Sequence, residues 1–145
     1  MRCLALDVGE RRIGVAVGEV LARPLTTLRR RSKAQDFAVL AELVRQHQID
    51  TLVVGLPLNI DGSSGFQAQR TARYAEQLQS ALSETGLTMQ MVLWDERLST
   101  AHADTLLSEV GYNAGQRHTQ IDAAAAAVIL QSYLDHTRST NAAET

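Results

Sequence analysis

Cysteine, proline and lysine are all scarce in this chain of 145 residues, which has one cysteine and two prolines. A single cysteine, Cys3, excludes an internal disulfide and any metal site built from several cysteines. No apolar run is long enough to cross a bilayer, so the sequence predicts no membrane-spanning segment. The apolar stretch at the N-terminus ends at Asp7 and is too short for a signal peptide, which predicts a cytoplasmic protein.

Charge is distributed unevenly along the chain, although the net charge is only −2. Residues 1–33 contain eight of the fourteen basic residues and three acids, so this segment carries +5 and the remainder carries −7. Such a segment predicts either a local basic face that contacts phosphates or a hairpin edge on which basic residues discourage strand pairing. Because lysine is nearly absent, contacts with phosphate would fall to arginine.

The hydrophobic pattern predicts one α/β domain over residues 1–138, followed by a disordered polar tail over 139–145. Strands are expected at 4–8, 13–17, 25–28, 51–54 and 89–94, with Pro24 breaking the chain before the third. Helices are expected at 35–47, 66–83, about 99–110 and 120–135, and polar loops at 59–65 and 111–118. A β-meander followed by βα units predicts a mixed five-stranded sheet flanked by helices.

Asp7 is the most informative single residue, because it lies between Leu6 and Val8 in an otherwise apolar strand. A bare carboxylate buried there would cost several kcal/mol unless another group compensates its charge. A divalent cation is the natural compensation, since hard cations bind carboxylate oxygens. The alternative is a structural aspartate that hydrogen-bonds the turn at Gly9, and the cost of burial favours the functional interpretation.

Two further acidic segments could complete a metal site. Asp95 and Glu96 follow the last predicted strand, where open α/β sheets bind ligands, although a solvated strand end explains them equally well. Asp122 is expected to open the last helix, where it fits both a capping box beginning at Thr119 and the helix dipole. The five alanines at 123–127 would let this helix approach the sheet closely and bring Asp122 to the centre of the sheet.

Three carboxylates from two strands and a helix could hold two metal ions, which can activate a water and stabilise the leaving oxygen in phosphodiester cleavage. Carboxylate ligands suit Mg²⁺ or Mn²⁺. Other chemistries have less support, since the four histidines are scattered and no histidine base lies near Ser63. Trp94 could stack on a base, but tryptophan is more often a core residue.

Four segments resemble, in order, the motifs of the YqgF family over residues 2–135. They are LALDVGERRIGVAV at 4–17, VVGLPLNIDGS at 53–63, DERLST at 95–100, and IDAA with ILQSYL between 121 and 134. Members of this family are described as Holliday junction resolvase-like proteins and as nucleases of precursor 16S ribosomal RNA. The resemblance implies a ribonuclease H-like fold related to the RuvC resolvases, with strand order 3-2-1-4-5 and strand 2 antiparallel.

The same resemblance implies the site residues. The acidic residues of the family fall on Asp7, Glu96 and Asp122, as catalytic residues and metal ligands, with Asp95 as the alternative to Glu96. The positions expected to bind substrate are Arg12, Asn59, Gly62, Ser63 and Arg97.

The sequence therefore predicts a nuclease that depends on Mg²⁺ or Mn²⁺ and processes the 5′ end of precursor 16S ribosomal RNA, as a monomer or homodimer. Single-stranded or junction DNA is the other expected class of substrate. A non-catalytic nucleic-acid-binding factor in transcription or ribosome assembly is the alternative, which the presence of all three acids disfavours. An actin-like phosphotransferase would need two such domains, and 145 residues supply one.

Overall fold

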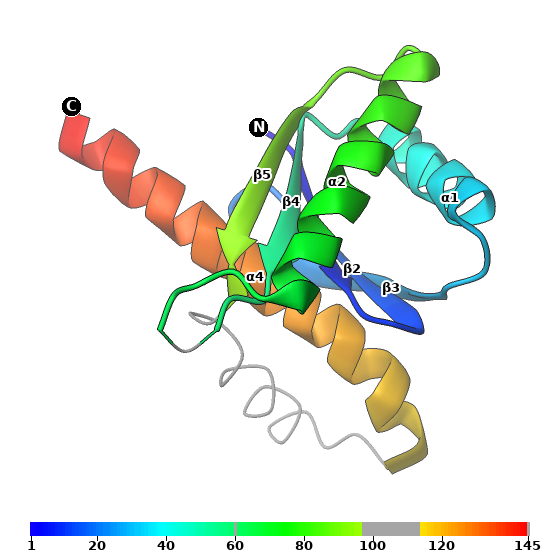
Figure 1. Ribbon diagram of the computed structural model, residues 1–145. Helices are drawn as coiled ribbons and strands as arrows, with labels where there is room; N and C mark the ends of the chain where they lie inside the picture. The colour runs from blue at the N-terminus through cyan, green and yellow to red at the C-terminus, as the bar shows by residue number, and fades with distance from the viewer. Residues whose placement is uncertain (60, 97–113, 145) are drawn as a thin grey trace.

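A computed structural model describes residues 1–59, 61–96 and 114–144, the side chains of 114–120 and 140–144 excepted, and contains one five-stranded sheet in the order β3-β2-β1-β4-β5 (Figure 1). The strands are β1 (Cys3–Val8), β2 (Arg12–Gly18), β3 (Arg23–Arg29), β4 (Thr51–Leu56) and β5 (Gln90–Asp95). The strands β1, β2 and β3 pair antiparallel, whereas β4 is parallel to both β1 and β5. The predicted mixed sheet and its strand order are confirmed.

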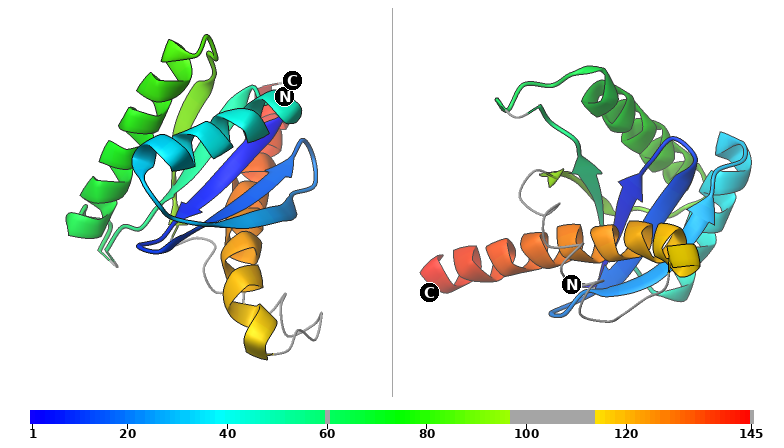
Figure 2. Two further views of the ribbon diagram at one scale, coloured as in Figure 1. Left: turned by 90° about the vertical axis from the view of Figure 1, so that its right-hand side faces the viewer. Right: turned by 90° about the horizontal axis from the view of Figure 1, so that it is seen from below.

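Helices cover both faces of this sheet (Figure 2). They are α1 (Lys33–Gln46), α2 (Phe66–Glu84) and α4 (Ala114–Glu144). The first two lie on one face and α4 lies on the other. Because side chains alternate along a strand, Leu4 and Leu6 of β1 join the core under α1 and α2, whereas Cys3 and Ala5 join the core under α4.

The alanine run brings α4 very close to the sheet, as the sequence predicts. Ala126 is completely buried, and the helix packs across β1, β2 and β3. At the crossing with β2, a Cβ atom on Gly14 would collide with the backbone of Asp122. A glycine on the strand and alanines on the helix are therefore both needed for this approach, which places the backbone of Asp122 against Gly14 of β2.

Two expectations about α4 are wrong, because the helix is longer at both ends than the apolar pattern indicates. It begins at Ala114, so residues 114–118 are helical and not part of a loop, and it runs through residues 139–144, for which a disordered tail is expected. Alanine favours helix, and no proline or glycine interrupts the chain after Gly115. The helix expected at 99–110 and residues 111–113 lie outside the described part of the chain. Within the described residues, no helix is long and apolar enough to cross a membrane.

Pro24 lies inside β3 and does not precede it, which corrects the predicted start of this strand. The residue pairs with Ala16 of β2, next to a register shift at which β3 has one additional residue, Leu25. Because β3 is an edge strand with β2 as its one neighbour, a proline is tolerated there, since no further strand needs a hydrogen bond from its outer side.

Candidate active site

Asp7 and Glu96 form the buried part of the candidate site. Asp7 is the last but one residue of β1, and the alternation of the strand directs its side chain to the α4 face. Burial raises the pKa of Asp7 to about 8, and a hydrogen bond with Glu96 and the negative charges of Glu96 and Asp122 act in the same direction. Asp7 therefore lies among other carboxyl groups and takes up a proton in the absence of a cation.

Glu96, and not Asp95, is the neighbour of Asp7. Asp95 ends β5, and Glu96 follows it in the same register as Val92 and Trp94, whose side chains pack on the α4 face. Gly55 of β4 lies beside Glu96, because a Cβ atom there would be in ordinary van der Waals contact, at 3.7 Å, with the Glu96 Cδ.

Asp122 is contributed by α4, the helix that covers this face of the sheet. Its Oδ2 atom accepts a hydrogen bond of 2.7 Å from Arg12 Nε at the start of β2, in an ion pair whose side chains are 25% and 43% exposed. Since α4 begins eight residues earlier, Asp122 does not cap the helix, and the expectation of a capping box at Thr119 is wrong. If Asp122 has a purely structural role, that role is its ion pair with Arg12 and not an interaction with the helix dipole.

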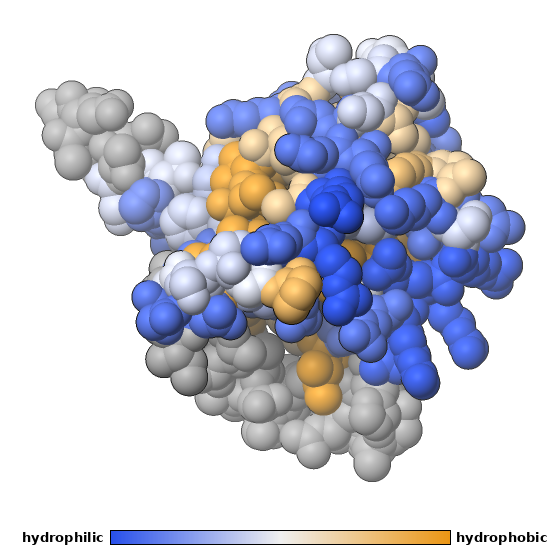
Figure 3. Space-filling view, viewed as in Figure 1, coloured by the Kyte–Doolittle hydropathy of each residue, from blue (hydrophilic) through white to orange (hydrophobic). Residues whose placement is uncertain are grey.

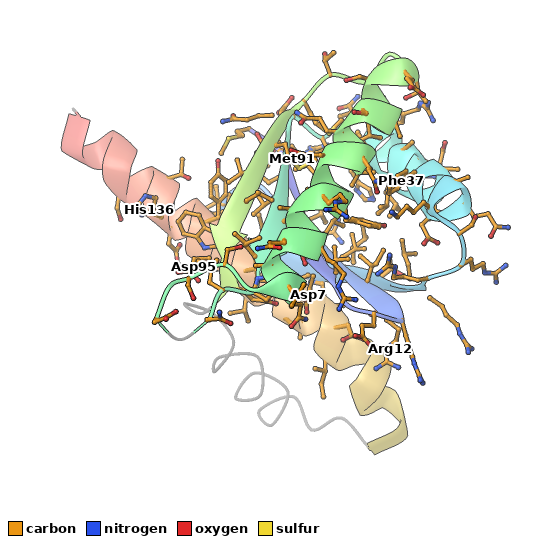
Figure 4. All side chains as sticks on the ribbon, viewed as in Figure 1. Asp7, Arg12, Phe37, Met91, Asp95 and His136 are labelled. Atoms are coloured by element: carbon orange, nitrogen blue, oxygen red, sulfur yellow. The ribbon has the colours of Figure 1, made fainter. Side chains whose placement is uncertain are left out.

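The donor atoms of the three carboxylates fit a hard divalent cation, although their arrangement is not that of a complete metal site. Within the described residues, no group of three or more His, Cys, Asp or Glu side chains is close enough to hold a metal ion. Asp7 and Glu96 are joined by a hydrogen bond, and Asp122 is turned to Arg12. The Asp7 pKa is raised by burial and by the neighbouring negative charges. A bound cation would lower this pKa, because its positive charge would stabilise the ionised carboxylate. Figure 4 shows Asp7, Arg12 and Asp95 at the same end of the sheet.

The predicted loop at 59–65 follows β4 at this end of the sheet, and its polar residues bond mainly to one another. Asn59 Nδ2 donates to Ser63 Oγ over 3.0 Å, and the Ser63 hydroxyl donates to Asp61 Oδ1 over 2.6 Å. Gly62 has a φ of 88°, which favours glycine. The contacts of Asn59, Gly62 and Ser63 therefore shape the loop, and their expected role towards substrate remains a prediction. Arg97, expected to bind substrate, lies outside the described residues.

A basic pocket, missed by the sequence analysis, opens beside the end of β1 on the opposite face of the sheet. We use this name for a hollow of about 260 Å³ lined by Arg30, Lys33, Arg70 and Arg73, together with Val8, Gly9, Glu10, Gln67, Thr71 and Tyr74. Strongly hydrophilic side chains gather over the start of α2 and the neighbouring part of the sheet (Figure 3). The spacing of Arg70 and Arg73 places both on one side of α2, but the sequence does not show which other element they would face.

Trp94 is a structural residue. Its indole Nε1 donates to Ser132 Oγ over 3.1 Å, and its ring packs against Tyr133 and His136 of α4. These contacts agree with the interpretation of Trp94 as a core residue and not as a platform for a base.

Comparison with known proteins identifies the family. The profile of the family described as "RuvX: Holliday junction resolvase" matches residues 1–136. A relative from Moorella thermoacetica is 46% identical over 138 residues, which are 93% of this chain and 95% of the relative. A relative from Anaeromyxobacter sp. (strain Fw109-5) is 45% identical, covering 93% of this chain and 97% of the relative. Both carry the name "Putative pre-16S rRNA nuclease".

Two solved structures with a similar fold are those of resolvases. T. thermophilus RuvC in complex with a Holliday junction substrate has a TM-score of 0.59 at 14% identity, covering 95% of this chain and 96% of that chain. The yeast mitochondrial Holliday junction resolvase Ydc2 has a TM-score of 0.50 at 12% identity, covering 95% of this chain and 82% of that chain. At such low identity these matches establish the fold alone, which is the expected RuvC-like ribonuclease H fold.

Proposed function

The chain belongs to the RuvX family, and from this membership we propose that it is a nuclease that hydrolyses phosphodiester bonds with the help of a divalent cation. The observation that carries the proposal is that Asp7 of β1 is hydrogen-bonded to Glu96 after β5 and lies within the electrostatic influence of Asp122 on α4. A chain has no structural need to place two further acids near a buried aspartate, where their negative charges disfavour the charge of Asp7.

The chain's own residues would act as follows. Asp7 would give up its proton, so that it and its hydrogen-bond partner Glu96 would present carboxylate oxygens on the α4 face. Asp122 would complete the set once released from Arg12. Mg²⁺ or Mn²⁺, when bound there, supplies an activated water and charge stabilisation for the leaving oxygen. Arg12, freed from Asp122, is placed to donate hydrogen bonds to a phosphate oxygen of the substrate.

We infer the substrate from the relatives. Because proteins more than 40% identical over most of this chain are named for pre-16S rRNA, precursor 16S ribosomal RNA is the proposed substrate, with cleavage at its 5′ end. Single-stranded or junction DNA is the second class, since the RuvC structure with a similar fold holds a Holliday junction. The alternative is a non-catalytic nucleic-acid-binding factor.

Cleavage assays with a matched pair of variants test this proposal. Wild-type protein, Asp7→Asn and Asp95→Asn are incubated with end-labelled precursor rRNA, single-stranded DNA and a four-way junction, with Mg²⁺, Mn²⁺ or EDTA. We expect metal-dependent cleavage of the RNA by the wild type and by Asp95→Asn, and none by Asp7→Asn. Binding of all three proteins to RNA without cleavage by any of them would support the binding factor instead.

A further inference from the structure

We propose that the basic pocket binds a phosphate group of the substrate strand other than the one that is cleaved. This inference rests on the proposed function and adds a second contact point for the same nucleic acid. The pocket lies beside Gly9 and Glu10, directly after Asp7, but on the α1 and α2 face of the sheet, whereas the carboxylates lie on the α4 face. A strand held at both places would pass around the turn between β1 and β2.

The charges of the pocket favour an anion. Four basic side chains converge from the β3–α1 connection, the start of α1 and the first half of α2, and Glu10 is the only acid among the described lining residues. Neither Arg70 nor Arg73 forms a hydrogen bond or ion pair with another residue that the structure describes. Like charges gathered in this way repel one another until an anion binds between them, and arginine donors match phosphate oxygens in geometry.

One of the cations is held in place before any ligand arrives. Arg30 Nη1 donates to the Gly9 carbonyl oxygen over 2.9 Å, and its guanidinium carbon lies 5.0 Å from the centroid of the Tyr74 ring. A guanidinium fixed by the turn and by an aromatic ring loses little conformational freedom when it binds. Arg30 therefore gives the pocket a fixed positive wall, and Lys33, Arg70 and Arg73 are the exposed side chains that close on the ligand.

The size of the pocket limits the ligand. A hollow of about 260 Å³ is smaller than the pockets of roughly 300–1,000 Å³ that enclose drug-sized molecules. Its volume suits a phosphate with part of its sugar. The phosphate can come from inside the strand or from its end, where a phosphate monoester carries close to two negative charges.

Binding of oligonucleotides in EDTA tests the proposal separately from catalysis. Arg70→Gln with Arg73→Gln, made in the Asp7→Asn background, removes two pocket cations and keeps the helix formers of α2. The matched control is Arg45→Gln with Arg138→Gln, which changes the net charge equally at exposed ion pairs away from the pocket. We expect the pocket variant to bind a single-stranded RNA about tenfold more weakly than the control. The slope of log K against log salt should also become shallower by about 0.7, the value for one phosphate contact on a single strand.

Chemistry at the RNA ends distinguishes the two sources of the phosphate. If the pocket holds a terminal phosphate, a 5′-hydroxyl or a 3′-hydroxyl RNA will bind more weakly than its phosphorylated form, and the pocket variant will lose that difference. If it holds an internal phosphate, the tenfold loss will be the same for every end. Equal affinities and salt slopes for the pocket variant and the control would overturn the proposal.

Inorganic phosphate provides a readout that does not depend on the nuclease proposal. In an NMR titration of the wild type, we expect amide shifts at Gly9, Gln67 and Thr71 that are absent in the pocket variant. If Asp7→Asn cleaves RNA as well as the wild type, the nuclease site is wrong, but these shifts still report on the pocket. Phosphate-induced shifts spread evenly over other basic surfaces, with none in the pocket, would contradict the inference.

Discussion

The carboxylate site and the basic pocket lie on opposite faces of the same strand end and differ in how their charges are held. On the α4 face, Asp7 is partly buried among other acids, so its charge is suppressed by a pKa of about 8. On the other face, Arg70 and Arg73 are exposed to solvent at the rim of the basic pocket. Burial means that a charged Asp7 destabilises the fold unless a cation is bound. Exposure means that the arginines of the basic pocket do not destabilise the fold, but each one alone interacts only weakly with an opposite charge.

This difference teaches which substitutions should be severe. A buried carboxyl group lowers the free energy of unfolding when no ligand compensates its charge. Its replacement should therefore raise stability while lowering the cleavage rate. The replacement of an exposed cation changes binding and the salt dependence of binding with little change in stability.

The largest expected effect is that of Asp7→Asn. Even partners outside the first ligand shell of a metal typically contribute 10–100-fold, so loss of a direct ligand should reduce the cleavage rate by more than about 100-fold. The fold should be at least as stable as the wild type, because the substitution removes a poorly solvated carboxyl group. Rates of metal-dependent cleavage and thermal midpoints in EDTA measure both, with Asp95→Asn as the control.

The stability difference between the wild type and Asp7→Asn should depend on pH. In the folded wild type Asp7 binds its proton up to a pKa of about 8, whereas in the unfolded chain it loses the proton near 3.8. The wild type therefore loses stability as pH rises from about 4 to about 8, and Asp7→Asn does not share that loss. The midpoint of the variant should rise relative to the wild type across this range in EDTA. A difference that stays constant with pH would show that Asp7 is not protonated in the fold.

The next prediction distinguishes two roles of Asp122, as a ligand of the cation or only as the ion-pair partner of Arg12. If Asp122 serves only to hold Arg12, then Asp122→Asn and Arg12→Gln break the same half-exposed pair and should have the same small cost, up to about 1 kcal/mol. If Asp122 holds a cation, its substitution should reduce turnover far more than that of Arg12. We expect this second result, measured as cleavage rates at several metal concentrations. A small stability cost in Asp122→Asn with turnover unchanged at every metal concentration would remove Asp122 from the site.

The sequence predicted much of the fold because its signals were local. The strands and the first two helices follow from apolar periodicity, and the alanine run correctly indicated close packing of α4. The predictions that failed concerned Pro24, the start of α4 and its end, where the edge position of β3 and the continuous helix propensity of the chain outweighed the apparent breaks.

The site was predicted less completely for a physical reason. Asp7 is visible in the sequence because a charge in an apolar strand is expensive, but Asp95 and Glu96 are indistinguishable until the register of β5 is known. The basic pocket joins Arg30, Lys33, Arg70 and Arg73 from three segments, and only packing brings them together. Long-range convergence of exposed charges leaves no periodic pattern in a sequence.

A smaller effect concerns the approach of α4 to the sheet. Gly14→Ala places a methyl group against the backbone of Asp122, which cannot move without shifting the helix, so a cost of about 1–3 kcal/mol is expected. In Gly55→Ala the new methyl group meets Ile129 Cδ1 at 2.6 Å, the end of a side chain that can rotate away. We therefore expect Gly14→Ala to lower both the unfolding free energy and the cleavage rate, and Gly55→Ala to change both less. Denaturant unfolding and the cleavage assay measure these changes, and the reverse order would contradict the close approach.

The smallest expected effect belongs to Arg29 and Arg31, which are two of the eight basic residues of segment 1–33. Both line a separate shallow hollow with Gln35 and Asp36, not the basic pocket. Arg30 between them is left unchanged in this test, because it supports the turn at Gly9. Arg29→Gln with Arg31→Gln should therefore weaken RNA binding only through the long-range field, by less than about threefold at 0.15 M salt.

Salt distinguishes this field effect from a direct contact. The Arg31 backbone N–H, which donates to Asp36 Oδ1 over 3.1 Å, is kept in the variant, so the start of α1 should be unchanged. Raising the salt concentration should remove the small loss of affinity, since exposed charges farther apart than the Debye length of about 8 Å no longer act on the strand. If Arg29→Gln with Arg31→Gln instead weakens binding as much as Arg70→Gln with Arg73→Gln, and flattens the salt slope equally, the strand crosses β3 as well. The basic side would then be one continuous phosphate track in place of a single pocket.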